Sequence, residues 1–210
     1  MKVFKKFSAI IILGRPGSGK DTQAELLADR FGLAHLISSH IIEKALKSKT
    51  KTIKIDSKAY NVEKERLIQR SGYLNTSAFV TALMKDEIKK TARRSLGIIM
   101  SGSPRTLGEF KEETSMIEKL YGKSNIYFFH VIIGQKEVYI RNLKRHRKDL
   151  PELDSRKIIK KRLEVFARDT WPVIKLLKKQ KRIIDINGEQ KIMLVHYDIL
   201  RALNKTWRLP

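Results

Sequence analysis

A glycine-rich stretch, Gly14-Arg-Pro-Gly-Ser-Gly-Lys-Asp-Thr22, has residue types and spacing that suit the binding of phosphate groups. It follows an apolar run at 8–13 and precedes residues 23–31, where apolar residues recur at helical spacing. Strand, glycine-rich turn and helix, in this order, are the context that a phosphate-binding loop requires. The glycines let successive N–H groups point at an anion, and the helix start adds unpaired donors and a positive dipole end. We therefore expect a nucleoside triphosphate here, rather than a turn that only joins two elements.

Two side chains of this loop add further chemistry. Lys20 supplies a point charge for the outer phosphates, and Thr22 supplies a hydroxyl that can reach a metal ion. The loop residues predicted to bind the nucleoside triphosphate are Gly14, Pro16, Gly17, Ser18, Gly19, Lys20, Asp21 and Thr22.

Apolar runs that alternate with helical patterns predict an α/β fold. The expected strands are 8–13, 34–37, 97–100, 126–133 and 182–186. The expected helices are 23–31, 41–46 with Ser38 or Ser39 as its cap, 62–70, one capped by Thr76 or Ser77, 138–148, 158–177 with a bend near Pro172, and 192–203. The basic segment 47–58 predicts a loop or hairpin, and 149–155 a polar break. Near-continuous apolar strands separated by helices indicate a mainly parallel sheet of about five strands, with helices on both faces.

Length and composition limit the other classes of protein. A chain of 210 residues can form one domain, 1–210, with insertions. Without cysteine there is no disulfide framework and no thiolate metal site, and the five histidines lack ligand spacing, so we expect no zinc. No segment approaches a transmembrane span, and the apolar run at 10–13 is too short for a signal peptide. We expect a cytoplasmic protein with no membrane partner, most simply a monomer.

The net charge of +23 and the isoelectric point near 10.2 are extreme. Lysine and arginine are spread along the whole chain, so the field attracts polyanions such as nucleotides, RNA and anionic membrane. A well-solvated surface is the first explanation, and no aromatic-plus-basic RNA motif accompanies the charge. Charge alone does not decide between these explanations.

Six motifs in order resemble the adenylate kinase family, the nucleoside monophosphate kinases, over essentially the whole chain. They are Gly14–Gln23, His35–Ser39, Gly72–Leu74, Gly102-x-Pro-Arg-Thr106, Arg141-x-x-x-Arg145 and Lys161–Leu163. The resemblance implies a P-loop NTPase core with two mobile insertions. Residues 38–86 would grip the monophosphate, and 140–158 would form a short lid. The implied reaction is magnesium-dependent transfer of the γ-phosphate of ATP to AMP.

Phosphoryl transfer between two nucleotides needs cations that converge on both phosphate chains. The catalytic residues that the resemblance implies are Lys20, Arg105, Arg141, Arg145 and Arg162. Arg141 and Arg145 lie four apart, which predicts one helix face. Arg141 would also stack on the donor adenine, and the loop at Gly188 would touch that base. The implied monophosphate-binding residues are Ser39, Lys44, Gly102, Arg105 and Glu109.

The chain departs from the family pattern at several of these positions. The family's aspartate before Gly-x-Pro-Arg, which helps to hold magnesium through water, is Ser101. An aspartate of the monophosphate segment is Ile41, and the arginine that grips the acceptor phosphate is Lys44. An expected lid arginine near Pro151 is missing, although Arg147 or Lys148 could replace it, and the paired lid aspartates correspond to Leu153-Asp154 or to Asp149.

Two further departures lead to hypotheses. Asp21 replaces a glycine beside the phosphates, and we hypothesise that it compensates for Ser101 by helping to hold Mg²⁺; a helix-start acid that only suits the dipole is the alternative. Glu109 replaces a base-reading glutamine, and an acceptor-only carboxylate could take the amino proton of adenine but fits the N1–H and N2 amino donors of guanine better. AMP ranks first, followed by GMP or a deoxynucleotide. The alternative function is a weakly active nucleotide-binding module that associates with RNA or ribosomes.

Overall fold

The structure is a computed structural model that describes residues 8–145 and 154–206. Several sequence expectations fall outside this part of the chain. They are the central part of the lid, the end of the helix expected at 138–148, and residues Arg147, Lys148, Asp149, Pro151 and Leu153.

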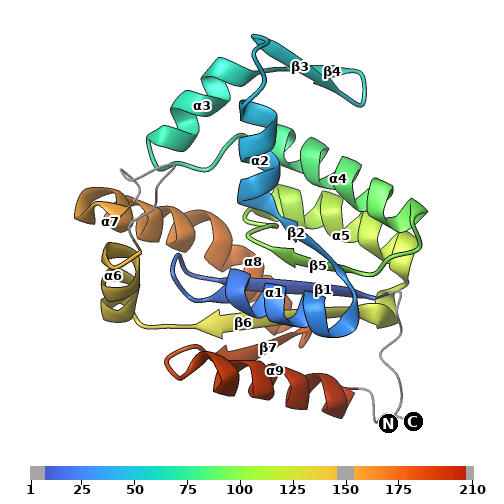
Figure 1. Ribbon diagram of the computed structural model, residues 1–210, viewed down its shortest axis with the longest axis vertical. Coiled ribbons are helices and arrows are strands. Elements are labelled where there is room, and N and C mark those ends of the chain that lie inside the picture. The colour runs from blue at the N-terminus through green and yellow to red at the C-terminus, as the bar shows by residue number, and fades with distance from the viewer. Residues whose placement is uncertain (1–7, 146–153, 207–210) are drawn as a thin grey trace.

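Five parallel strands form the central sheet (Figure 1). In the order in which they lie across the sheet, they are β2 (Ala34–Ile37), β5 (Ile98–Ser101), β1 (Ala9–Gly14), β6 (Ile126–Ile132) and β7 (Ile183–Asn187). All five predicted strands are confirmed, and so is the α/β class. Parallel pairing brings the carboxyl ends of the strands to one edge, where an open α/β sheet binds its ligands.

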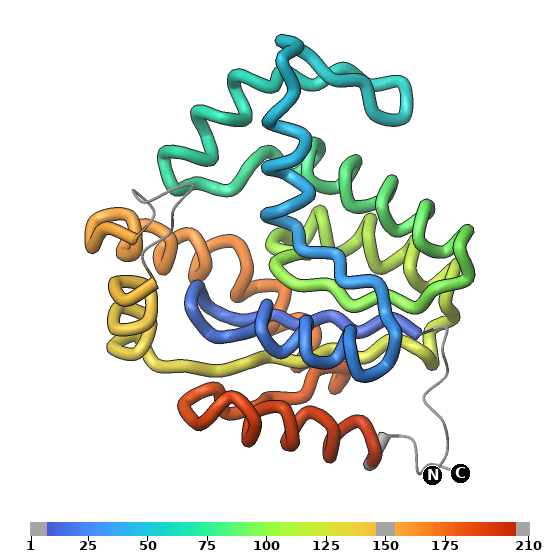
Figure 2. The backbone as a smooth tube through the Cα atoms, viewed as in Figure 1, coloured from blue at the N-terminus to red at the C-terminus, as the bar shows by residue number. Residues whose placement is uncertain are grey.

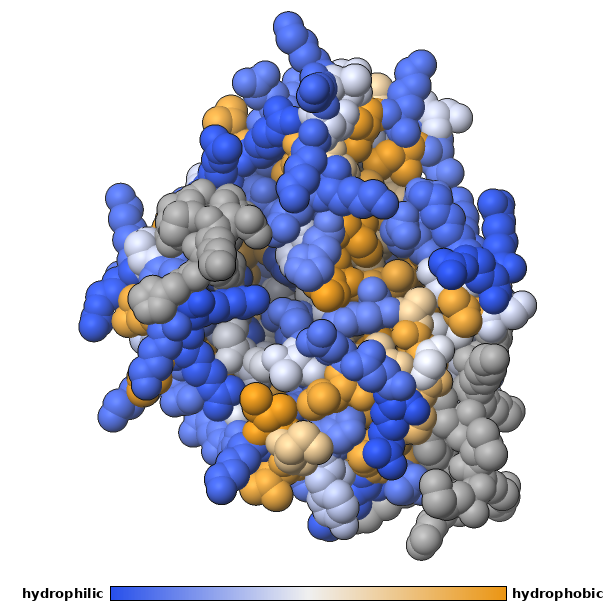
Figure 3. Space-filling model, in the orientation of Figure 1, coloured by the Kyte–Doolittle hydropathy of each residue, from blue (hydrophilic) through white to orange (hydrophobic). Residues whose placement is uncertain are grey.

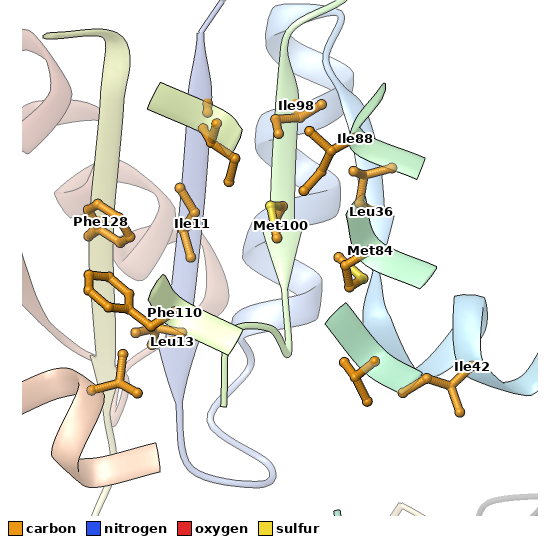
Figure 4. Close-up of a cluster of buried hydrophobic side chains, with 14 of the residues drawn as sticks. Ile11, Leu13, Leu36, Ile42, Met84, Ile88, Ile98, Met100, Phe110 and Phe128 are labelled. Atoms are coloured by element: carbon orange, nitrogen blue, oxygen red, sulfur yellow. The ribbon is translucent and has the colours of Figure 1, made fainter. Parts of the chain in front are cut away.

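Side chains alternate between two cores, one on each face of the sheet. Ile11 and Leu13 of β1 point into one core, and Ile10 and Ile12 point into the other, as the period of two along a strand requires. The first core is covered by α2 (Ser38–Leu46), α4 (Ser77–Arg93), α5 (Leu107–Tyr121) and α8 (Trp171–Lys179). The second is covered by α1 (Lys20–Phe31) and α9 (Ile192–Thr206). Figure 4 shows the first core, in which Ile11, Met100 and Phe128 from three strands meet helix side chains such as Met84.

A segment between β2 and α4 extends away from the sheet (Figure 2). Helix α2 leads to a two-stranded antiparallel hairpin, β3 (Thr52–Ile55) and β4 (Lys58–Asn61), which is followed by α3 (Val62–Arg70). Its turn residues Asp56 and Ser57 have positive φ values of 46° and 67°. Two consecutive left-handed residues match the right-handed twist of the strands that they join. The hairpin expected in the basic segment is confirmed.

Three helix predictions differ from the structure. Helix α2 begins at Ser38 with Ile37 as its cap, so Ser38 and Ser39 are inside the helix. The helix expected at 158–177 is divided into α7 (Arg156–Val165), a π-helical segment (Phe166–Thr170) and α8. The break lies directly before Pro172, because proline lacks the N–H that an uninterrupted helix needs.

Helix α6 (Gln135–Leu143) ends earlier than the pattern predicts. The expectation that Arg141 and Arg145 lie on one helix face is therefore wrong, since Arg145 follows the helix end. Helix α5 was not predicted, because its buried positions include Glu109, Glu113 and Thr114, which hide the apolar stripe.

Among the described residues, no helix combines the length and apolarity that crossing a bilayer demands.

We expect Phe79→Ala to lower the free energy of unfolding by about 3–5 kcal/mol, the usual cost of truncating a buried phenylalanine. Phe79 is 0% exposed in the first core, and its ring centroid lies 5.6 Å from that of Tyr60 in the hairpin. Urea unfolding of both proteins gives the difference. The control is Leu67→Ala on α3, where the side chain is 66% exposed and the expected change is within about 0.5 kcal/mol. Equal effects of the two substitutions would contradict the packing described here.

Candidate active site

The glycine-rich loop turns sharply between β1 and α1. Gly17 and Gly19 have φ values of 80° and 86°, a region that side chains disfavour. A Cβ on Gly14 would lie 2.6 Å from Ser18 Oγ and 2.7 Å from the carbonyl oxygen of Val131, so the backbone passes very close to β6. Helix α1 begins at Lys20 with no side-chain cap. Its first N–H groups therefore remain available to an anion.

Two cavities open at this loop, at the carboxyl edge of the sheet. The first, of about 290 Å³, lies between the loop and the segment from α2 to α4, and the second, of about 400 Å³, lies between the loop, α6 and the start of α9. Gly17, Lys20, Asp21 and Arg145 line both cavities. Two ligands that occupied them would therefore meet at these four residues.

Arginines from three other segments gather around Lys20. Burial lowers the pKa of the Lys20 ammonium, and the nearby charges of Arg105, Arg162 and Arg145 lower it further, against the opposing effect of Asp21. All four cations line the first cavity. The structure thus brings Lys20, Arg105, Arg145 and Arg162 together, as the sequence predicts.

Main-chain carbonyl groups hold two of the predicted arginines in place. Arg105 donates from Nε to the oxygen of Gly102 at 2.5 Å, and its Nη2 lies 3.4 Å from Ser38 Oγ. Arg141 donates from Nε to Glu137 Oε1 at 2.6 Å and from Nη2 to the oxygen of Gly188 at 2.8 Å. Arg141 and Gly188 both line the second cavity, together with Ile192.

Asp21 is held beside these cations at the end of β5. Its Oδ2 lies 3.6 Å from Lys20 Nζ. Ser101 Oγ lies 3.1 Å from His35 Nε2 on β2. Burial alone would raise the pKa of Asp21, but Lys20, the Ser101 hydroxyl and two arginines lower it to about 2. The site therefore contains a carboxylate that stays ionised in the middle of a cationic cluster.

Two more carboxyl groups lie inside α5. Glu109 is 1% exposed and lines the first cavity, and it accepts hydrogen bonds from Arg105 N at 2.6 Å and from Ser77 Oγ at 3.3 Å. Glu113, one turn further on, accepts from Ser103 Oγ at 2.8 and 2.9 Å. Burial raises the pKa of both groups, and the pKa of Glu113 lies well above its ordinary value.

The remaining predicted residues divide into those that line a cavity and one that does not. Gly14, Pro16, Ser39 and Gly102 line the first cavity, and Ser18, Gly19 and Thr22 line the second. Lys44 does not line either cavity, and its side chain is exposed on α2.

Sequence reasoning missed the supporting roles of Asn142 and His35. Asn142 donates from Nδ2 to the oxygen of Pro16 at 3.1 Å and so ties α6 to the loop. The sequence offered one signal for each residue. Asn142 is a polar residue at a position of α6 that is buried, and His35 lies in β2, four residues before Ser39.

Comparison with known proteins adds to this geometry. The sequence profile described as adenylate kinase matches residues 12–182. The chain belongs to the adenylate kinase family. It is 30% identical over 196 residues to adenylate kinase 1 of a Nostoc species, which covers 92% of this chain and 97% of that protein. It is 29% identical over 196 residues to the adenylate kinase of Bacteroides thetaiotaomicron, covering 93% and 98%. Human adenylate kinase isoenzyme 5 is 28% identical over 200 residues, or 90% of this chain and 31% of that protein.

Membership of the adenylate kinase family makes the protein an ATP-dependent nucleoside monophosphate kinase. The predicted P-loop NTPase fold is confirmed as well. Two cavities that share one cationic boundary are consistent with phosphoryl transfer, in which positioning and charge neutralisation account for most of the catalysis.

We expect Glu113→Gln to stabilise the protein more at pH 8 than at pH 4. The folded protein holds the Glu113 proton more tightly than the unfolded chain does, so wild-type stability falls as pH rises from 4.5, the ordinary pKa of this carboxyl, towards its raised folded pKa. Glutamine keeps an acceptor for Ser103 and does not ionise. Melting temperatures at both pH values measure the effect.

Glu112→Gln is the matched control for this prediction. Glu112 is exposed beside Glu113 and pairs with Lys85 at 3.0 Å, which lowers its pKa through a hydrogen bond and charge attraction. Its substitution should give no gain at high pH. A Glu113→Gln gain that is the same at both pH values would refute the role assigned to burial.

Proposed function

We propose that this member of the adenylate kinase family transfers the γ-phosphate of ATP to AMP, with Mg²⁺ bound to ATP. The observation that carries the proposal is the shared boundary of the two cavities, which Gly17, Lys20, Asp21 and Arg145 line from both sides. Two nucleotides whose phosphate chains point at this boundary would react in line, away from bulk water.

The second cavity would hold ATP. In this proposal the loop from Gly14 to Thr22 binds the phosphates through its N–H groups, and Lys20 neutralises the outer phosphates. Arg141 presents the face of its guanidinium group to the adenine, which the bonds to Glu137 and Gly188 support by fixing its orientation. Arg145 and Arg162 stabilise charge on the transferred group.

The first cavity would hold AMP, with Arg105, Ser39 and Gly102 near its phosphate. Lys44 would have to turn inward to contribute, since it is exposed on α2. Glu109 would meet the base. As an acceptor, the Glu109 carboxylate could take the amino proton of adenine. The adenylate kinases among the relatives support AMP as the acceptor.

The residues near Lys20 fit a magnesium ion. Magnesium is usually held by one or two carboxylates together with substrate phosphates and water, and Asp21 offers an ionised carboxylate next to the hydroxyl of Thr22. In the described part of the chain, no group of three or more histidine or acidic side chains forms a denser metal site. When bound, Mg²⁺ supplies positive charge to the phosphates. Asp21 approaches the end of β5 from α1, near Ser101, the residue at the position of the family's aspartate.

The two insertions complete the proposal. Residues 38–86 would close on the monophosphate, and 140–158 would close on ATP. The ammonium of Lys161 on α7 lies 3.6 Å from the centre of the Tyr73 ring, so the first insertion already contacts the helix that follows the second. We further propose that the protein is a monomer and that it acts in the cytoplasm.

A coupled assay for ADP formation tests the reaction, with AMP, GMP, CMP, UMP and dTMP as acceptors. We expect the highest kcat/KM with AMP. Lys20→Ala should lower kcat about 10²–10³-fold, because a charge that acts on the transition state is removed. Lys119→Ala, at an exposed position of α5, is the control. A higher kcat/KM with GMP would overturn the choice of acceptor, and no turnover with any acceptor would overturn the proposal.

We expect Asp21→Asn to raise the Mg²⁺ concentration needed for half-maximal turnover by about tenfold, the effect of one lost ion contact of roughly 1.4 kcal/mol. The double variant Asp21→Asn with Ser101→Asp should recover much of this loss, since it returns a carboxylate to the end of β5. Binding of Mn²⁺ to the protein–ATP complex, followed by electron paramagnetic resonance, reports the same change without turnover. Glu25→Gln, an exposed acid of α1, controls for charge removal. Unchanged magnesium dependence in Asp21→Asn would leave only the helix-dipole role for this residue.

A further inference from the structure

Six exposed lysines surround the hairpin that projects from the sheet. Lys47, Lys49 and Lys51 lie in the approach to β3, Lys54 and Lys58 lie on the two strands, and Lys64 lies on α3. None of them lines either nucleotide cavity. We call these six residues and the hairpin that they surround the lysine arm. Figure 3 shows hydrophilic side chains extending from this end of the molecule, at the top of the view.

The lysine arm is a positive surface with almost no internal compensation. In the part of the chain that the structure describes, no carboxylate forms an ion pair with any of the six lysines. The acid at the hairpin turn, Asp56, is paired with Lys89 of α4 at 2.9 Å. The arm therefore presents a field that an external anion would neutralise.

Local hydrogen bonds give the arm a defined shape. Arg66 donates from Nε to the oxygen of Leu46 at 2.8 Å and from Nη2 to the oxygen of Ser48 at 2.6 Å. Thr50 Oγ1 donates to the oxygen of Thr52 at 2.8 Å. The segment that carries Lys47, Lys49 and Lys51 is thus tied to α3 and β3, so less conformational entropy is lost when it meets a ligand.

The apolar side chains of the hairpin face the protein. Ile53, Ile55 and Tyr60 pack against the first core, and the exposed strand and turn positions carry Thr52, Lys54, Asp56, Ser57, Lys58, Ala59 and Asn61. A membrane-docking surface adds apolar side chains that enter the lipid, and the outer face of the hairpin has none of large size. It also has no aromatic ring on which a base could stack. What it offers is point charges on flexible side chains carried by an ordered backbone.

We propose that the lysine arm binds the phosphate backbone of nucleic acid without reading its sequence. Ammonium groups neutralise phosphates and release condensed counterions, which gives strong salt dependence and little sequence preference. The arm lies outside both nucleotide cavities, so a bound strand would leave them accessible.

The test measures binding of a labelled single-stranded RNA of about 20 nucleotides to the full chain by fluorescence anisotropy, over a range of KCl concentrations. The variant carries Lys49→Gln, Lys51→Gln, Lys54→Gln and Lys58→Gln. For single strands, the slope of log K against log salt is about −0.7 per neutralised phosphate, so the slope should become shallower by about 3. Binding at low salt should weaken by at least about tenfold. DNA of the same sequence should bind within about threefold of RNA, because the contacts are to phosphate.

A matched variant separates the arm from the general charge of the protein. It carries Lys119→Gln, Lys123→Gln, Lys175→Gln and Lys179→Gln, four exposed lysines of α5, α8 and the loop between α5 and β6. Both variants should keep the wild-type melting temperature. Lys20→Ala and saturating ATP should leave RNA binding unchanged, so failure of the kinase proposal would not affect this one. Equal losses in the two variants, no loss in the arm variant, or tighter binding to vesicles of phosphatidylglycerol than to RNA at equal salt would each overturn the proposal.

Discussion

The active site depends on holding several cations close together around the glycine-rich loop, although they repel one another. The rest of the molecule positions these cations. Lys20, Arg105, Arg145 and Arg162 come from four separate segments, and their mutual repulsion contributes to the lowered pKa of Lys20. Without ligand, Asp21 is the carboxylate that most directly offsets this repulsion. Substrate phosphates would add much more negative charge at the same place. The scaffold thus keeps a binding site ready at a cost in electrostatic energy that its ligands remove.

A central strand that is buried on both faces can support such a cost because tight packing keeps it from moving. Residues 9–12 of the central strand are 0% exposed and packed on both faces, so the loop that follows them has little freedom to relax. The same tight fit recurs after β5, where a Cβ on Gly102 would lie 2.6 Å from Ser38 Oγ and 3.0 Å from Arg105 Nη2. The position of Arg105 is therefore set by backbone approach as much as by its own hydrogen bonds. Rigid elements therefore place the charges.

The elements and residues that were predictable from sequence have local signals. The strands at 8–13 and 126–133 are continuous apolar runs, and all the residues that define the glycine-rich loop are contiguous in the sequence. Helix α5 was missed because Glu109 and Glu113 point inward, and only tertiary partners such as Ser103 make their burial tolerable. The hydrogen bond between His35 and Ser101 joins residues 66 positions apart, which no local pattern encodes. The same holds for the bond from Asn142 to the loop.

Composition gave the charge of +23 but not how it is divided, and the structure shows two different arrangements. Arginines at the cavities donate to main-chain carbonyls, as Arg105 does to Gly102 and Arg141 does to Gly188. A planar guanidinium group has enough N–H donors to bind a carbonyl oxygen and a phosphate at the same time. An arginine that is anchored to the main chain can therefore still bind a phosphate. The exposed lysines of the hairpin have no such anchors, and only the backbone that carries them is held by hydrogen bonds. Anchored arginines suit one ligand in one orientation, whereas free ammonium groups on a rigid support suit a repeating anion in any register.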